Sequence, residues 1–326
     1  MAFKLSRYNY IRLIELDNIH CILHSPQTMT AHVNSFILKR LLVVVLILTA
    51  SVRFHCTYAD TAKSFSTNDA YVDCEAFNKS LTDGIVALYE AKRTSSMTEL
   101  LADISTAHCS ITLTEPLKET LSPAGLFARF KKSVVMIGSI YKCPKCHDWH
   151  SNTSTGFLIT KTGVVVTAYH AVYNPDHTAM GAITSDGRTC AVNKILAADK
   201  DADVAIIQID VTGLEPMALA AGTAVGDRVF VISHPGKRPF TLSSGIVSGF
   251  FLIKEANDKH GRQRMTISAD YGVGSSGGPV IDECGNVAGM VATTQPVMAG
   301  CDSNHYAQMI FKDCIPAKSI RVLTTK

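Results

Sequence analysis

Two different spacings of apolar residues divide the chain. Between residues 73 and 107 apolar side chains recur every three or four positions, with a break at residues 94–96, which predicts two short amphipathic helices. After Pro123 the apolar residues form short runs rich in β-branched side chains and separated by Gly, Asn and Asp, which predicts strands. The predicted strands cover residues 134–141, 156–160, 164–168, 204–209, 228–233, 245–253, 265–268 and 287–294.

Many short strands without helical segments between them are typical of an all-β sandwich or barrel. No segment repeats at the spacing of roughly 20–50 residues that marks solenoids and propellers, so we exclude those folds. The pattern divides the chain into a signal-peptide region (1–59), a small helical N-terminal extension (60–125) and a β-rich domain (126–326).

The longest apolar run, residues 41–50, directly follows the basic pair Lys39 and Arg40. A basic pair, a run of about 10–12 apolar residues and then small residues at Thr57 and Ala59 are typical of a secretory signal peptide. We therefore expect cleavage after Ala59 and a secreted or periplasmic protein with no stable membrane span. A retained signal anchor is the alternative, although the run is short for a membrane span.

Residues 1–28 form a polar leader that is long for a signal peptide, whereas Met29 begins a segment of normal signal-peptide proportions. A start assigned too early is one interpretation of these residues, and a long leader is the other. Neither interpretation changes the assignment of the β-rich domain.

Charge is distributed unevenly between the signal region and the rest of the chain. The formal net charge is +3, but residues 1–59 carry six Lys or Arg and two Asp or Glu. The other residues therefore hold 25 basic and 26 acidic side chains, a net charge of −1. This near-neutral body gives no electrostatic basis for binding nucleic acid, so we exclude that function class. The absence of a run of about 18 apolar residues excludes a polytopic membrane protein.

The cysteines beyond the signal region are even in number, which suggests disulfides in an exported protein. They are Cys74, Cys109, Cys143, Cys146, Cys190, Cys284, Cys301 and Cys314. Cys74 and Cys109 bracket the two predicted helices, so a disulfide between them would close a helical hairpin. Cys284 and Cys301 form a weaker candidate pair.

The segment CPKCH, residues 143–147, has three interpretations. It fits the attachment pattern of c-type haem, and Cys143, Cys146, His147 and His150 have the residue types of a zinc site. The third interpretation is a local disulfide that tightens an exposed hairpin. We favour the disulfide because no core surrounds the segment to house a haem, and we therefore expect no metal.

Three segments of the β-rich domain carry residues that suit nucleophilic catalysis. His170 follows a predicted strand in TAYHAV, and Asp203 directly precedes another in DADVAIIQI. A carboxylate at the start of a buried strand needs a partner, and a histidine N–H is a natural one. Ser276 lies in GSSGGPV, where the glycines allow unusual backbone angles and close approach of another chain. The N–H groups of Gly274 and Ser276 can converge beside the hydroxyl to bind a tetrahedral oxyanion.

In this order, His, Asp and Ser match one known arrangement of a catalytic triad. The three motifs together resemble those of trypsin-like, chymotrypsin-fold serine proteases, above all the compact bacterial HtrA/Deg-like proteases and glutamyl endopeptidases. Residues 233–249, SHPGKRPFTLSSGIVSG, also resemble the family's segment that opens the second barrel. The resemblance covers roughly residues 127–324, and no PDZ module follows.

The resemblance implies two six-stranded antiparallel β-barrels with the active site in the cleft between them. It implies Ser276 as the nucleophile, His170 as the general acid and base, and Asp203 as the residue that orients the histidine. The amides of Gly274 and Ser276 would then form the oxyanion hole.

The resemblance also suggests substrate-binding residues. Asp270 lies six residues before Ser276, where trypsin-like enzymes hold the acid that captures basic side chains, although bacterial relatives have an Asp there without that preference. Thr293 and Thr294 fall where the resemblance places a pocket wall, and a β-branched residue there would make the pocket shallow. Ser275 replaces the Asp that pairs with a new N-terminal ammonium in zymogen-type relatives, so we expect other contacts to order the oxyanion hole.

We therefore expect a serine endopeptidase that cleaves protein or peptide substrates through an acyl-enzyme, without a cofactor. Two alternatives stay open: a catalytically inactive, protease-like binding protein, and an exported redox or haem protein that uses the CPKCH segment. The sequence leaves the physiological substrate and the oligomeric state open.

Overall fold

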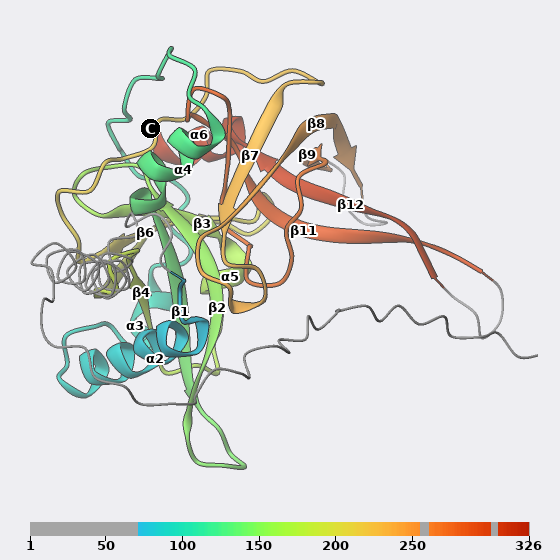
Figure 1. Cartoon of the computed structure of the whole chain (residues 1–326). Coiled ribbons are helices and arrows are strands. Elements are labelled where there is room, and N and C mark those ends of the chain that lie inside the picture. Colours follow the sequence, from blue (N-terminus) through green and yellow to red (C-terminus); the bar gives the residue numbers. More distant parts are fainter. Residues whose placement is uncertain (1–70, 255–260, 301–305, 326) are drawn as a thin grey trace, which may run out of the picture. The chain divides into compact units, whose positions relative to one another are not determined.

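The computed structural model describes residues 71–254, 261–300 and 306–325, and these residues form two closed antiparallel barrels (Figure 1). The first barrel has the strand order β1-β2-β3-β6-β5-β4. Its strands are β1 (Val134–Lys142), β2 (Trp149–Leu158), β3 (Val164–Ala168), β4 (Ala179–Ile183), β5 (Thr189–Asp199) and β6 (Val204–Ile209).

The second barrel has the strand order β10-β11-β12-β9-β8-β7. Its strands are β7 (Arg228–Ser233), β8 (Thr241–Ile253), β9 (Arg262–Ile267), β10 (Pro279–Ile281), β11 (Val287–Ala299) and β12 (Tyr306–Pro316). The predicted fold class, all-β with two six-stranded barrels, is therefore confirmed.

Strand β3 is buried along its whole length, which explains its unbroken apolar sequence VVVTA. Val165 belongs to the core inside the first barrel together with Ile137. Val166 belongs to a second core that also contains Phe230 and Ile232 of β7. Because protein covers both faces of the strand, polar and apolar residues do not alternate along it. The shared core joins the two barrels directly beside the end of β3.

Short helices accompany the barrels. They are α2 (Cys74–Glu90), α3 (Met97–Ala102), α4 (Pro123–Phe130), α5 (Tyr169–Val172) and α6 (Ala317–Thr324), with 3-10 turns η1 (Lys131–Ser133) and η2 (Pro235–Lys237). The Asp73 side chain caps α2 by accepting the Ala76 N–H at 2.9 Å, and a capping box between Ser96 and Glu99 begins α3. No described helix has the length and apolar character needed to cross a membrane.

Helix α2 packs on the first barrel through Leu81 and Ile85, which are fully buried. Ile85 lies against Gly138 of β1 and Gly181 of β4, which pair with each other across the two strands. A Cβ atom at Gly138 would lie 2.9 Å from Ile85 Cδ1, and one at Gly181 would lie 2.6 Å from Ile85 Cγ1. Side chains at either position would push the helix away, so the glycine pair permits the close contact.

The structure contradicts the expected disulfide between Cys74 and Cys109, because both cysteines are free. Cys74 begins α2, which packs on the first barrel, whereas the Cys109 N–H donates to the Leu323 carbonyl of α6 at 2.9 Å. The chain after α3 therefore runs toward α6 and does not close a helical hairpin. Of the weaker pair, Cys284 is free and Cys301 lies outside the described residues.

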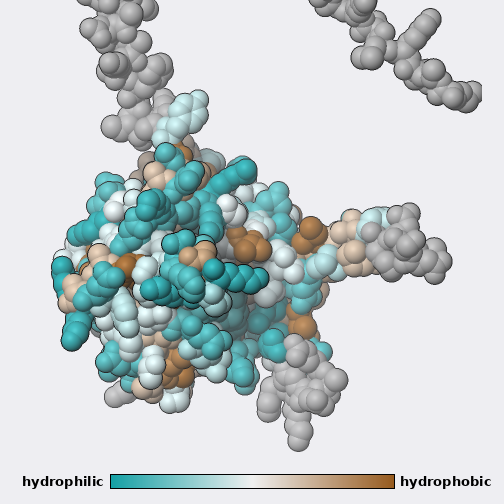
Figure 2. All heavy atoms as spheres, turned by 90° about the horizontal axis from the view of Figure 1, so that it is seen from below, coloured by the Kyte–Doolittle hydropathy of each residue, from teal (hydrophilic) through white to brown (hydrophobic). Residues whose placement is uncertain are grey.

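The hairpin of β11 and β12 extends well beyond the second barrel (Figure 1). Apolar side chains lie on the surface of this arm (Figure 2), and Val297, Met298, Met309 and Ile310 are exposed. The two strands pair there through their backbones, with Val297 opposite Met309. The apolar sequence at the end of β11 therefore does not reflect burial in the barrel wall.

We predict that Leu81→Ala lowers the free energy of unfolding by about 2–5 kcal/mol, because it opens a cavity between α2 and the first barrel. Lys79→Ala, on the exposed side of the same helix, is the control and should change this free energy by less than about 0.5 kcal/mol. Urea unfolding followed by circular dichroism measures both. Equal stability of the two variants would show that α2 lies outside the cooperatively folded unit.

Candidate active site

The pairing of β3 with β6 brings His170 beside Asp203. Ala168 at the end of β3 pairs with Val204 at the start of β6. His170 follows Ala168 by two residues in the short helix α5, and Asp203 directly precedes Val204. Strand register therefore places the two predicted triad residues at the same edge of the first barrel.

Asp203 holds the imidazole of His170 in a fixed orientation. The Nδ1 atom of His170 lies 3.0 Å from Asp203 Oδ1 and 2.9 Å from Oδ2, and the His170 backbone N–H also donates to Oδ1 at 3.0 Å. A carboxylate only accepts, so Nδ1 carries a proton, and in the neutral imidazole Nε2 is then the acceptor. The side chain of Asp203 is 15% exposed and that of His170 is 48% exposed, so the base reaches solvent while its partner is shielded.

Ser276 lies on the loop that precedes β10, and this loop is attached to the first barrel. The Thr155 N–H of β2 donates to the Ser276 carbonyl at 2.8 Å, and Thr155 Oγ1 donates to the Gly274 carbonyl at 2.8 Å. The Ser276 hydroxyl donates to the Ala292 carbonyl of β11 at 3.2 Å rather than to His170. Catalytic hydrogen bonds are often unformed without substrate, and a hydroxyl changes partner by rotation about χ1.

The backbone around Gly274 has the orientation that an oxyanion hole requires. The Val273 carbonyl accepts a hydrogen bond from the Gly236 N–H at 2.7 Å. In a trans peptide the C=O and the following N–H point in opposite directions, so the Gly274 N–H points away from Gly236. Among the described residues neither this N–H nor that of Ser276 has a backbone or side-chain acceptor. Both donors are therefore available to a bound oxyanion.

Ser275 supports the same loop from its buried side. Its side chain is fully buried, and its hydroxyl oxygen accepts hydrogen bonds from Ser233 Oγ at 3.0 Å and from the Gly272 N–H at 3.3 Å. These neutral hydrogen bonds occupy the position where zymogen-type relatives use a charged pair.

A second ordering contact comes from helix α2. Asn78 Nδ2 donates to the Lys237 carbonyl at 2.8 Å, and the ring of Phe77 packs edge-to-face on Phe240 with centroids 5.6 Å apart. Both contacts are made with the loop of residues 234–240. This loop contains Gly236, whose N–H donates to the Val273 carbonyl. Helix α2 is therefore linked to the peptide between Val273 and Gly274 through one intervening loop.

The loop of residues 234–240 is itself ordered by a buried imidazole. His234 Nδ1 accepts the Phe240 N–H at 3.0 Å, and the ring packs edge-to-face on that of Phe240. Burial lowers the pKa of His234 to about 3, so the ring is neutral and Nδ1 remains an acceptor at physiological pH.

Of the three predicted substrate-binding residues, Asp270 and Thr294 both lie next to Lys312, and Thr293 lines the groove beside His170. Asp270 has a side chain that is 92% exposed, and its Oδ1 atom lies 3.0 Å from Lys312 Nζ. Lys312 also donates to the Tyr271 carbonyl at 3.2 Å. Thr294 is exposed and pairs with Lys312 across β11 and β12, whereas Thr293 lines a groove beside the triad. The Asp270 carboxylate therefore already has a cationic partner.

The groove beside His170 has a volume of about 490 Å³. It contains aromatic, polar and cationic side chains from both barrels. Its lining residues are Tyr169, His170, Tyr173, Lys200, Asp203, Ile253, Arg262, Arg264, Thr293 and Gln295.

The comparison with known families agrees with this geometry. Residues 154–290 match the trypsin-like peptidase domain family, and the matched span contains His170, Asp203 and Ser276. These residues are therefore similar to a trypsin-like peptidase domain. The matched span leaves out α2 before it and the whole of β12 after it.

The trypsin-like domain is similar to HtrA and Deg proteases. The chain is 30% identical over 155 residues to the chloroplastic protease Do-like 5 of Arabidopsis thaliana, across 44% of this chain and 48% of that protein. It is 28% identical over 144 residues to the mitochondrial serine protease HTRA2 of Drosophila pseudoobscura pseudoobscura, across 43% of this chain and 34% of that protein. The chain thus spans less than half the length of these curated relatives.

Among solved structures, the HtrA-type protease AlgW with a tripeptide superposes with a TM-score of 0.48. The sequence identity is 21%, and the superposition covers 61% of each chain.

We predict that Gly274→Ala removes most peptidase activity of the trypsin-like domain. Gly274 has φ +95°, and an added Cβ would lie 2.5 Å from the His234 carbonyl oxygen, so the peptide that carries the oxyanion donor must move. The loss of one such donor lowers kcat about 10²–10³-fold. Gly272→Ala, where no neighbour lies within 4 Å of the added Cβ, is the control. Equal kcat values for the two variants would contradict the assignment.

We also predict that Asn78→Ala lowers kcat about 5-fold with little change in KM. It removes one hydrogen bond to the loop of residues 234–240, and such a bond contributes about 1 kcal/mol. Thr82→Ala is the matched control, because Thr82 lies one turn later on α2 and bonds Ser151 instead. Steady-state kinetics with a peptide substrate distinguish the two variants. If kcat falls equally in both, α2 acts only through general stability.

Proposed function

We propose that this chain is a serine endopeptidase that hydrolyses peptide bonds through an acyl-enzyme. One observation carries the proposal. Ser276 lies beside two backbone donors that have no acceptor among the described residues, on a loop fixed to the barrel that presents His170 oriented by Asp203. The curated relatives support the same reaction class, since one is named a protease and the other a serine protease.

In the proposed mechanism Ser276 Oγ attacks the carbonyl carbon of the substrate while His170 Nε2 takes the hydroxyl proton. The N–H groups of Gly274 and Ser276 stabilise the negative charge on the former carbonyl oxygen. His170 then gives the proton to the leaving amine, and the C–N bond breaks to leave the acyl-enzyme. A water molecule repeats both steps, releases the carboxylic acid and restores Ser276. Asp203 keeps its charge and stabilises the imidazolium.

The first step requires the Ser276 hydroxyl to leave the Ala292 carbonyl. In the proposed mechanism a change of χ1 turns the hydroxyl toward His170, and this change breaks the hydrogen bond of 3.2 Å. A neutral hydrogen bond of this kind contributes about 1 kcal/mol, which is small beside the barrier reductions of about 8 kcal/mol or more that enzymes provide.

We further propose that the protein is secreted or periplasmic. The support is the basic pair before the apolar run of residues 41–50 and the small residues up to Ala59. These residues lie outside the described part of the chain. Proteins or peptides are the proposed substrates, and the proposed chemistry requires no cofactor.

We predict that Ser276→Ala abolishes hydrolysis of casein and labelling by a fluorophosphonate, because it removes the nucleophile without opening a core cavity. Ser275→Ala is the adjacent control. It loses two hydrogen bonds of the loop but no bond-making group, so it should still be labelled. An inactive binding protein would show no labelling in the wild type. Labelling of Ser275 in place of Ser276 would contradict the assignment of the nucleophile.

We predict that the wild type does not favour cleavage after Lys or Arg, because Lys312 already neutralises the Asp270 carboxylate. Lys312→Ala should raise kcat/KM for basic relative to neutral peptides, and the double variant Lys312→Ala, Asp270→Ala should lose this gain. Profiling of a peptide library measures the ratio. A wild type that prefers basic residues, with the preference unchanged in Lys312→Ala, would show that the ion pair does not control specificity.

A further inference from the structure

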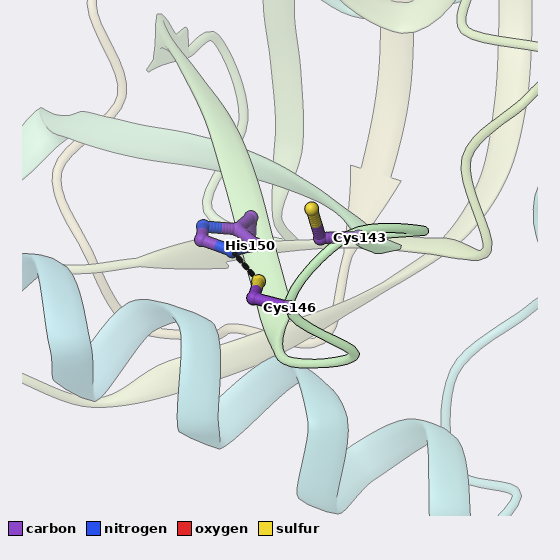
Figure 3. A group of neighbouring side chains, drawn as sticks. All are labelled: Cys143, Cys146 and His150. Carbon is purple, nitrogen blue, oxygen red and sulfur yellow. Dashed lines mark hydrogen bonds between the residues drawn. The ribbon is translucent and has the colours of Figure 1, made fainter.

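Three side chains with metal-binding atoms converge at the tip of the β1–β2 hairpin (Figure 3). The sulfur atoms of Cys143 and Cys146 and a ring nitrogen of His150 all lie within 4.8 Å of one another, and Cys146 Sγ is 3.1 Å from His150 Nε2. Tetrahedral zinc, with bonds of about 2.3 Å to sulfur and about 2.0 Å to nitrogen, places such ligands about 3.5–4 Å apart. Small changes in the side-chain angles of these three residues would therefore bring their ligand atoms to the distances of tetrahedral zinc coordination.

The two cysteines are free, so the local disulfide that the sequence favoured is not formed in the structure. Both sulfur atoms are therefore available as metal ligands, and they lie within 4.8 Å of each other and of a ring nitrogen of His150.

The turn is closed by its own backbone. The Cys143 N–H donates to the Asp148 carbonyl at 2.9 Å, and the His147 N–H donates to the Cys143 carbonyl at 3.0 Å. His147 has φ +61°, in the left-handed region, which lets the chain reverse within a few residues. The two sulfur atoms therefore come from one compact, hydrogen-bonded loop.

The third ligand comes from a regular strand. His150 on β2 pairs with Tyr141 on β1, and the two rings stack with centroids 5.8 Å apart. The hairpin register thus fixes the position of His150 relative to the loop. The convergent group does not include His147, the histidine that a c-type haem would use, so the geometry favours a small ion over a haem.

We propose that Cys143, Cys146 and His150 bind one zinc ion, with a water molecule at the fourth tetrahedral position. Thiolate and imidazole ligands favour zinc over magnesium or calcium, which prefer oxygen ligands. His150 also lines a groove of about 500 Å³ between β2, α2 and the loop that follows His234. Zinc would therefore fix one wall of this groove. The ligands are separate from the proposed triad, so the site stands independently of the proposed protease reaction.

The test uses the purified full-length protein under reducing conditions. Zn²⁺ is titrated in competition with a chromophoric chelator, and Co²⁺ is titrated while the absorption spectrum is recorded. We expect one zinc ion per chain, and a cobalt spectrum with a sulfur-to-metal charge-transfer band and tetrahedral d–d bands. Loss of an outer-shell partner typically weakens metal binding about 10–100-fold. The direct ligand variants Cys143→Ser, Cys146→Ser and His150→Ala should weaken it by more.

Two variants serve as controls. Cys284→Ser removes a free cysteine from the second barrel, and His147→Ala removes the neighbouring histidine that is not part of the convergent group. Both should bind zinc as the wild type does. Circular dichroism of each variant shows whether it has folded. If a ligand variant does not fold, the cobalt spectrum of the wild type alone tests the proposal. A cobalt spectrum without a charge-transfer band overturns the proposal. Unchanged zinc affinity in folded Cys143→Ser also overturns it.

Discussion

The contact of Thr155 with the serine loop is the constraint on which the rest of the site depends. Thr155 of the first barrel donates through its backbone to Ser276 and through its hydroxyl to Gly274. Gly277 permits this approach, since a Cβ there would lie 2.0 Å from the Thr155 carbonyl oxygen. The proposed nucleophile and the proposed oxyanion donors are thereby fixed to the barrel that also carries His170. A shift of one barrel against the other would disrupt the hydrogen bonds and the catalytic geometry together.

The oxyanion loop is ordered by neutral groups rather than by a buried ion pair. Ser275 binds Ser233 on the buried side, and the Gly236 N–H fixes the orientation of the peptide that precedes Gly274. Such contacts need no new N-terminus, whereas an unpaired ammonium buried next to a serine would be strongly unfavourable. Helix α2, from the N-terminal extension, contacts the loop that contains Gly236. A change in α2 would therefore be transmitted through this loop to the proposed oxyanion donors.

The sequence predicted strands correctly where a local pattern of residues determines the structure. Runs of Val and Ile predicted β3 and β6, but β4, with the sequence AMGAI, was missed because Ala and Gly have low strand propensity and only barrel closure places them in a sheet. Motifs identified the residues of the predicted triad. Gly236 was missed because it acts through its backbone, and Thr155 was missed because its contacts depend on how the two barrels pack together. The pairing of Asp270 with Lys312 depends on long-range register, and the even number of cysteines did not predict which of them are close.

The central claim is that Ser276 forms a covalent acyl-enzyme with the help of His170 and the two backbone donors. Stopped-flow measurement of nitrophenol release from an activated nitrophenyl ester tests it most directly. The account predicts a rapid burst of one nitrophenol per chain, a slower steady state, and an acyl group on Ser276 in peptides from acid-quenched protein. Linear release without a burst, or an acyl group on another residue, would contradict the account.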